Sequence, residues 1–159
     1  MVEFFKGIVA VVVGFVLGTA ATYLDRRRRC RAHWAALSAE IGICERLART
    51  YNTDGIAAPL YRLPVSAFAA SFPALLADGA VRANEVEDLA WFSGWVQDIN
   101  RGLDNADRAL HSGQTEQLNR EGSRLQLKCR ELLEGHGGNE SALARVRRIV
   151  QRHVGLTTS

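Results

Sequence analysis

An uninterrupted apolar stretch near the N-terminus constrains this chain more than any other feature. Residues 7–24 carry no charged side chain, and nine of these eighteen residues are Leu, Ile, Phe or Val. Eighteen helical residues rise by about 27 Å, close to the roughly 30 Å of a bilayer's hydrocarbon core. The sequence therefore predicts one transmembrane helix, with its span at about residues 4–24 and a membrane anchor over residues 1–25.

The charges around this stretch predict its orientation. A cleaved signal peptide, the competing interpretation, would carry its positive charges before the apolar residues, whereas here Lys6 is offset by Glu3. A basic juxtamembrane segment, residues 26–31, follows instead, and its arginines are Arg26, Arg27, Arg28, Arg29 and Arg31. Basic residues stay on the cytoplasmic side, so residues 26–159 are expected there. The same arginines suit contact with anionic lipid headgroups.

Small residues recur every four positions on one side of the predicted span, at Ala10, Gly14, Gly18 and Thr22. Such a face lets a second helix approach closely, so we expect self-association or a partner within the membrane. The alternative is that these glycines only reflect the general frequency of glycine in membrane helices.

Residues 32–138 are expected to form a helical bundle, because apolar residues recur there at alternating spacings of three and four. One such seam runs from Cys30 to Tyr51 and a second from Leu89 to Leu110, with Asn84 as the expected N-cap of the second helix. A third helix is expected to start near Thr115. All three prolines lie at positions 59–73, so residues 56–80 are expected to form an irregular lid across the end of the bundle. The predicted fold class is all-α, an N-terminal transmembrane helix followed by an antiparallel bundle of about four helices.

The last segment, residues 139–159, is predicted to be a basic amphipathic helix and tail capped by Asn139. Its possible surface-basic face contains Arg145, Arg148 and Arg152. Such a helix can lie on an anionic membrane or dock its apolar side on the bundle, and docking is the favoured alternative.

One stretch resembles a known group of proteins. Residues 60–68, residues 72–76 and the helix through Trp91, Phe92 and Asn100 look like a domain of uncharacterised bacterial membrane proteins. Those proteins place one N-terminal span before a helical cytoplasmic region, and the resemblance covers about residues 30–110. It implies location in the bacterial inner membrane as a single-pass protein, and it implies no reaction.

No pattern in the sequence predicts an enzyme. The four histidines and three cysteines show no metal-ligand spacing, and we identify no catalytic, cofactor-binding or metal-binding residue and expect no cofactor. Trp91 and Trp95 lie one helical turn apart beside the second seam; we expect them in the core, with an exposed patch for a partner as the alternative. The bundle region carries more acidic than basic residues, which argues against nucleic acid as a partner.

The function expected from these features is that of a membrane-anchored, non-enzymatic scaffold or regulatory module acting through protein contacts. Two alternatives remain open at this point. One is an accessory subunit of a larger membrane enzyme or transporter, and the other is a membrane-tethered binder of anionic lipid or nucleic acid through the two basic ends.

Overall fold

The computed structural model describes the backbone of residues 2–55 and 60–155, and the side chains of those residues from Gly14 onward. Its described part contains helices and no strand, which confirms the all-α prediction. The helices are α1 (Val2–Asp54), α2 (Ser66–Ala77), α3 (Ala83–His111), α4 (Thr115–Glu134) and α5 (Ala142–Gly155).

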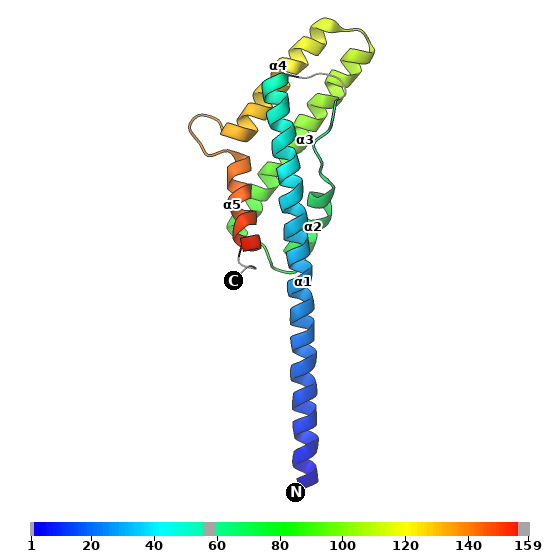
Figure 1. Cartoon of the computed structure of the whole chain (residues 1–159), viewed down its shortest axis with the longest axis vertical. Coiled ribbons are helices and arrows are strands. Elements are labelled where there is room, and N and C mark those ends of the chain that lie inside the picture. The colour runs from blue at the N-terminus through cyan, green and yellow to red at the C-terminus, as the bar shows by residue number, and fades with distance from the viewer. Residues whose placement is uncertain (1, 56–59, 156–159) are drawn as a thin grey trace.

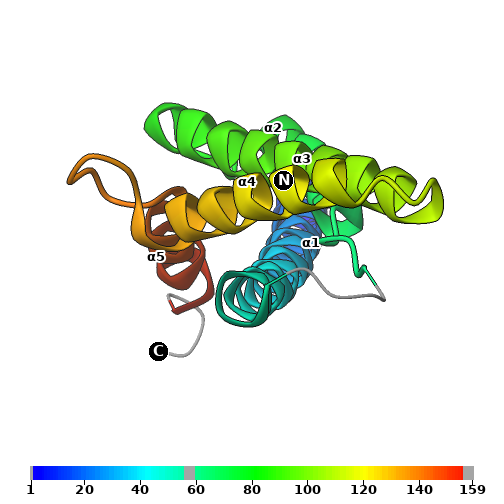
Figure 2. The same cartoon turned by 90° about the horizontal axis from the view of Figure 1, so that it is seen from above.

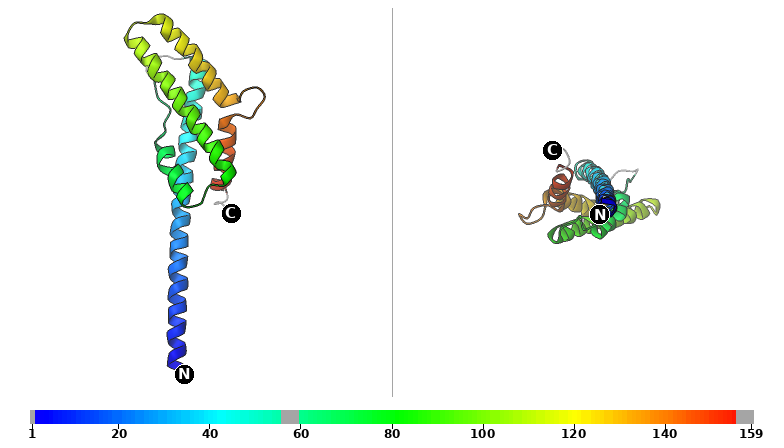
Figure 3. Two further views of the ribbon diagram at one scale, coloured as in Figure 1. Left: turned by 180° about the vertical axis from the view of Figure 1, so that it is seen from behind. Right: turned by 90° about the horizontal axis from the view of Figure 1, so that it is seen from below.

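Helix α1 is a single rod of 53 residues, and its N-terminal part projects well beyond the other helices (Figures 1 and 3). Its C-terminal half forms one side of the bundle. The predicted seam is buried there, at Trp34, Leu37, Ile41, Cys44, Ala48 and Tyr51. The N-terminal helix therefore continues into the bundle without a break.

The other helices pack around this half of α1. Helices α2 and α5 lie on opposite sides of it, and α3 and α4 form an antiparallel hairpin that crosses it (Figures 1 and 2). Helix α4 contacts both α3 and α1, so it lies between them (Figure 2). The shared core contains Leu89, Phe92, Val96, Ile99 and Leu103 of α3, Leu125, Cys129 and Leu132 of α4, and Leu143, Val146 and Val150 of α5.

The course of the chain differs from the expected alternation in two places. Residues 60–65 return along α1 and lead into α2, so they cover the side of the bundle and not its end (Figure 1). Helix α5 runs in the same direction as α4, because the connection between them loops outward before the chain continues (Figure 1). Three glycines with positive φ, Gly135, Gly137 and Gly138, form that loop.

Three local predictions need correction. Helix α3 starts at Ala83, and the Glu85 carboxylate accepts a hydrogen bond from the Arg82 N–H at 3.0 Å, so Asn84 is not the cap. Helix α5 is capped by Ser141, whose hydroxyl accepts the Ala144 N–H at 3.1 Å, and not by Asn139. Leu110 is exposed, because the tip of the α3–α4 hairpin extends past the end of α1 (Figure 1).

No helix is long and apolar enough to cross a membrane when only the described residues are considered. Positions 4–13 of the predicted span, including Ala10, lie outside the described side chains.

Candidate functional site

The projecting part of α1 exposes large apolar side chains. Phe15 is 72% exposed, Leu17 64% and Tyr23 65%, although all three lie in an ordinary α-helix. The hydroxyls of Thr19 and Thr22 donate hydrogen bonds to carbonyls one turn earlier, at 2.9 and 3.1 Å. The two threonine hydroxyls of this apolar stretch are therefore satisfied within the helix itself, as a nonpolar environment would require.

The predicted association face is open along the part that is described. A Cβ placed on Gly14 or on Gly18 would meet no atom within 4 Å, and Thr22 is exposed one turn further on. Nothing in the bundle covers these positions, so a second helix could approach them.

The arginines of residues 26–31 differ in their partners. Arg26 donates to the Asp78 carbonyl just after α2, and Arg29 lies 3.6 Å from Asp25 of its own helix. Arg27, Arg28 and Arg31 are exposed and form no ion pair with any described residue. These three guanidinium groups are therefore free to contact an anionic surface.

The basic residues of α5 are engaged with the bundle. Arg145 lies 2.9 Å from Asp88, Arg152 lies 2.8 Å from Glu85, and Arg148 pairs with Glu140 just before the helix. The arginines of the predicted surface-basic face therefore already have carboxylate partners.

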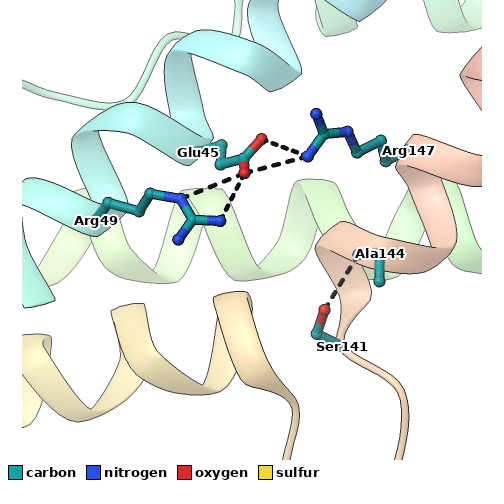
Figure 4. A network of polar contacts seen from close by, with 5 residues as sticks. All are labelled: Glu45, Arg49, Ser141, Ala144 and Arg147. Carbon is teal, nitrogen blue, oxygen red and sulfur yellow. Dashed lines mark hydrogen bonds and ion pairs between the residues drawn. The ribbon is translucent and has the colours of Figure 1, made fainter.

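A further arginine of α5 joins that helix to α1. The Arg147 guanidinium lies 3.1 Å from Glu45, which also binds Arg49 of its own helix at 2.9 Å (Figure 4). With its apolar side buried and its arginines paired, α5 is docked on the bundle, in agreement with the favoured alternative.

A buried carboxylate joins the start of α3 to the end of α5 and, through His153, to the middle of α1. Glu85 of α3 is 2% exposed and accepts hydrogen bonds from Arg152 at 2.8 Å and from the His153 Nε2 at 3.1 Å. The His153 ring stacks on Trp34 of α1, with centroids 4.2 Å apart. Burial by itself would raise the pKa of Glu85, but the Arg82 N–H, His153 and Arg152 together outweigh it and leave that pKa below its usual value.

Two more polar side chains hold the connection between α1 and α2. The Glu40 carboxylate accepts the backbone N–H groups of Ala67 and Phe68, at 2.6 and 2.8 Å. The side-chain amide of Asn100 binds both the N–H and the carbonyl of Leu63, each at 2.8 Å. These contacts bind peptide groups of the chain itself, so they position the connection and leave no open site for a ligand.

Trp91 and Trp95 line a hollow on the outer side of α3, which we call the tryptophan groove. Its first part has a volume of about 550 Å³ and is lined by Glu87, Ala90, Trp91, Gly94, Trp95 and Asp98. A second part of about 390 Å³ shares both tryptophans and continues to the α4–α5 loop and the start of α5. Trp91 is 55% exposed, so its predicted place in the core is wrong, whereas Trp95 is half-buried against the core.

The far wall of the tryptophan groove is the loop between α4 and α5. Gly135 has φ +87°, and a Cβ there would collide with the backbone carbonyl of Asn139. The N–H of Gly135 also bonds the Glu131 carbonyl at 2.8 Å, which closes the end of α4. Only glycine can therefore occupy this corner of the groove wall.

The described residues contain no group of three His, Cys, Asp or Glu side chains arranged to bind a metal ion. Burial raises the pKa of Cys44 to about 12 and that of Cys129 to about 11, which keeps both thiols protonated and unreactive at neutral pH.

Some of these polar residues could have been found from spacing alone. Glu85 precedes Leu89 by four positions and His153 follows Val150 by three, so both continue the apolar seams of their helices. A charged or titratable residue on a seam must find a partner when it is buried, and here the two find each other.

Comparison with known proteins gives no further information on the site, because no family model, curated protein or solved structure matches the chain. The resemblance to bacterial single-pass proteins stays a prediction.

Proposed function

We propose that the chain is a non-enzymatic, membrane-anchored helical module of the bacterial cell membrane, whose bundle lies in the cytoplasm and acts through contacts with other proteins. The observation that carries this proposal is the projecting part of α1. Its apolar side chains from Phe15 to Leu24 are exposed, and the helix reaches the bundle without a break.

Energetics favour a lipid environment for this segment. Large exposed apolar surfaces are unfavourable in water, and the Leu, Ile, Phe and Val residues of positions 7–24 are worth roughly −3 to −5 kcal/mol on the insertion scale. The intrahelical bonds of Thr19 and Thr22 remove the cost of bringing their hydroxyls into lipid.

The unpaired arginines support the proposed orientation. Arg27, Arg28 and Arg31 follow the apolar segment directly and have no carboxylate partner among the described residues. Basic residues at this position are retained in the cytoplasm and attract anionic lipid, at about 1 kcal/mol each.

Membrane insertion can be tested by alkaline carbonate extraction of cells that make the full chain. We expect the protein to stay in the membrane pellet, because a spanning helix resists extraction that releases peripheral proteins. Val2→Cys should react with a membrane-impermeant maleimide in spheroplasts, and Leu127→Cys, on the exposed side of α4, should react only after lysis. The unsubstituted chain gives the background of the native thiols. Release by carbonate, or labelling of Leu127→Cys before lysis, would contradict the proposal.

The proposed association of spans has its own test. We expect chemical cross-linking in native membranes to give a dimer that Gly14→Leu and Gly18→Leu together reduce several-fold, since large side chains would fill the open face. Val16→Leu is the control, because it enlarges an exposed residue off that face. Equal dimer yields in both variants would show that these glycines do not form the contact.

A further inference from the structure

The tryptophan groove combines features that a protein-binding site needs. Trp91 exposes more than half of its surface beside the partly buried Trp95, and the small residues Ala90 and Gly94 leave the space between them open. Leu127, another exposed apolar side chain of the bundle, lines a smaller and mainly polar hollow. Tryptophan in a preformed pocket is a favoured anchor of protein interfaces.

The charges around the groove select the partner. Its lining includes four carboxylates, those of Glu87, Asp98, Glu131 and Glu140. The last three are already engaged: Asp98 with Lys128, Glu140 with Arg148, and Glu131 with the His136 Nδ1 at 2.9 Å. Arg145, which also lines the groove, is itself paired with Asp88. Glu87 is exposed and forms no ion pair with any described residue. It precedes Trp91 by one helical turn, so an incoming cation could bind the carboxylate and the face of the indole together.

We propose that the tryptophan groove binds a segment of another protein that presents a large apolar side chain next to a lysine or arginine. The apolar side chain would enter the hollow between the two tryptophans, and the cation would pair with Glu87. The inference rests on the proposed function, because it names the kind of partner through which the bundle would act.

Lipid is a poor occupant of this groove. Trp34 lies ten residues beyond Leu24, so a helical rise of about 15 Å separates it from the end of the proposed span. Trp34 stacks on His153, which bonds Glu85, and α3 runs from Glu85 away from the projecting part of α1 (Figure 1). Trp91 follows Glu85 by six residues, which places the groove beyond the reach of the hydrocarbon core.

A second copy of the chain is also less suited to the groove. Several segments of this sequence place a basic residue next to a large apolar one. Arg62 beside Tyr61 and Lys128 beside Leu127 are already paired, with Asp104 and with Asp98. In α5 the apolar residues are buried in the bundle, and the arginines of residues 26–31 face the anionic membrane surface under the proposed function. The partner is therefore expected to be a different protein.

Site-specific photocross-linking in cells that make the full chain tests the inference. Benzoylphenylalanine replaces Trp91 in one variant and Tyr61, which is 62% exposed, in the control. We expect the Trp91 position to give a cross-linked peptide, identified by mass spectrometry, with a lysine or arginine within one helical turn of a large apolar residue. Adding Glu87→Lys should reduce this adduct about tenfold, and replacing the partner's basic residue by Glu should restore it.

Each other result overturns the inference. An adduct with lipid, with a second copy of the chain, or with a segment lacking a basic residue would identify a different occupant. So would a yield no higher than that at Tyr61 or an adduct unaffected by Glu87→Lys. Glu87 is exposed, so the circular dichroism melting curve of Glu87→Lys should match that of the parent chain.

The same cells separate this inference from the proposed function. Carbonate extraction reports the anchor whether or not the groove binds. Suppose that Tyr61 gives cross-links and Trp91 gives no higher yield. The bundle would then still contact other proteins, and only the proposed binding at the tryptophan groove would be excluded.

Discussion

Gly94 and Gly102 of α3 lie two turns apart and have opposite surroundings. A Cβ on Gly94 would meet nothing within 4 Å, whereas one on Gly102 would lie 2.5 Å from the Leu125 Cδ2 of α4. Leu125 is 1% exposed and has little room to move. Gly102 is therefore the position where the α3–α4 hairpin depends on the absence of a side chain.

This difference predicts opposite effects of the same substitution. Gly102→Ala should lower the free energy of unfolding by about 1 kcal/mol, because overpacking costs about 1–3 kcal/mol and helix propensity returns about 0.5–1 kcal/mol. Gly94→Ala, the matched control, should raise it by about 0.5 kcal/mol. Urea unfolding of the full chain in mild detergent, followed by tryptophan fluorescence, measures both. A Gly102→Ala variant as stable as Gly94→Ala would mean that Leu125 changes rotamer freely.

At the scale of the element, helix α2 depends on a residue of another helix. Its N-cap position, Val65, makes no side-chain cap, and the Glu40 carboxylate of α1 accepts the Ala67 and Phe68 N–H groups instead. The carboxylate also places negative charge at the positive end of the α2 dipole. The start of α2 therefore depends on the packing of α1.

We expect Glu40→Ala to loosen α2 specifically. Loss of a cap costs about 0.5–2 kcal/mol, so amide hydrogen exchange should accelerate in residues 67–77 by about twofold to thirtyfold while α3 changes little. Glu45→Ala is the control, because Glu45 lies on the same helix and binds Arg49 and Arg147 instead of α2. Exchange that rises equally in α2 and α3 would show a global effect and not a cap.

The contacts of Glu85 with Arg152 and His153 make the packing of α1, α3 and α5 depend on pH. Because the pKa of Glu85 is lower in the folded chain than its usual value near 4.5, ionised Glu85 favours folding above that value. This contribution is lost as the pH falls through the lower, folded pKa. The binding of Lys128 lowers the pKa of Asp98, so that group acts in the same direction.

Between about pH 6 and about pH 3.5, the free energy of unfolding should therefore fall, and it should fall less in Glu85→Gln than in the parent chain. Urea titrations at several pH values measure the slope. Glu87→Gln, two positions away and exposed, serves as the control and should keep the parental slope. If Glu85→Gln also keeps it, the carboxylate does not contribute to the acid sensitivity.

The spacing of apolar residues in the sequence predicts which side of each helix is buried. It does not predict contacts between side chains and backbone groups that are far apart in the sequence. The seams of α1 and α3 follow directly from positions such as Leu37, Ile41, Val96 and Ile99. The contacts of Glu40 with Ala67 and of Asn100 with Leu63 join residues 27 and 37 positions apart. A local capping rule contains no information about a residue on another helix, so these contacts appear only in three dimensions.

At the scale of the whole molecule, the N-terminal part of α1 contributes little to the stability of the bundle, whereas helix α5 contributes much. The bundle meets α1 from about Arg26 onward, through Asp78. Helix α5, in contrast, packs on α1 and α3 and buries Leu143, Val146, Ile149 and Val150. The direction of α5 was not predictable from spacing, because a glycine loop permits either course of the chain.

Two deletions should therefore differ in their effect on the bundle. Removal of residues 2–24 should change the free energy of unfolding by no more than about 0.5 kcal/mol, because it removes exposed residues. Removal of residues 142–159 should cost more than about 5 kcal/mol, since each of the four large side chains buried in α5 contributes about 1.5–3 kcal/mol. A domain of this size is stable by only about 5–15 kcal/mol, so this second variant should lack a cooperative melting transition. Thermal melting in one detergent buffer compares both with the full chain. An unchanged transition without α5 would mean that this helix does not pack on the bundle in solution. Its arginines would then be expected to bind the membrane surface instead.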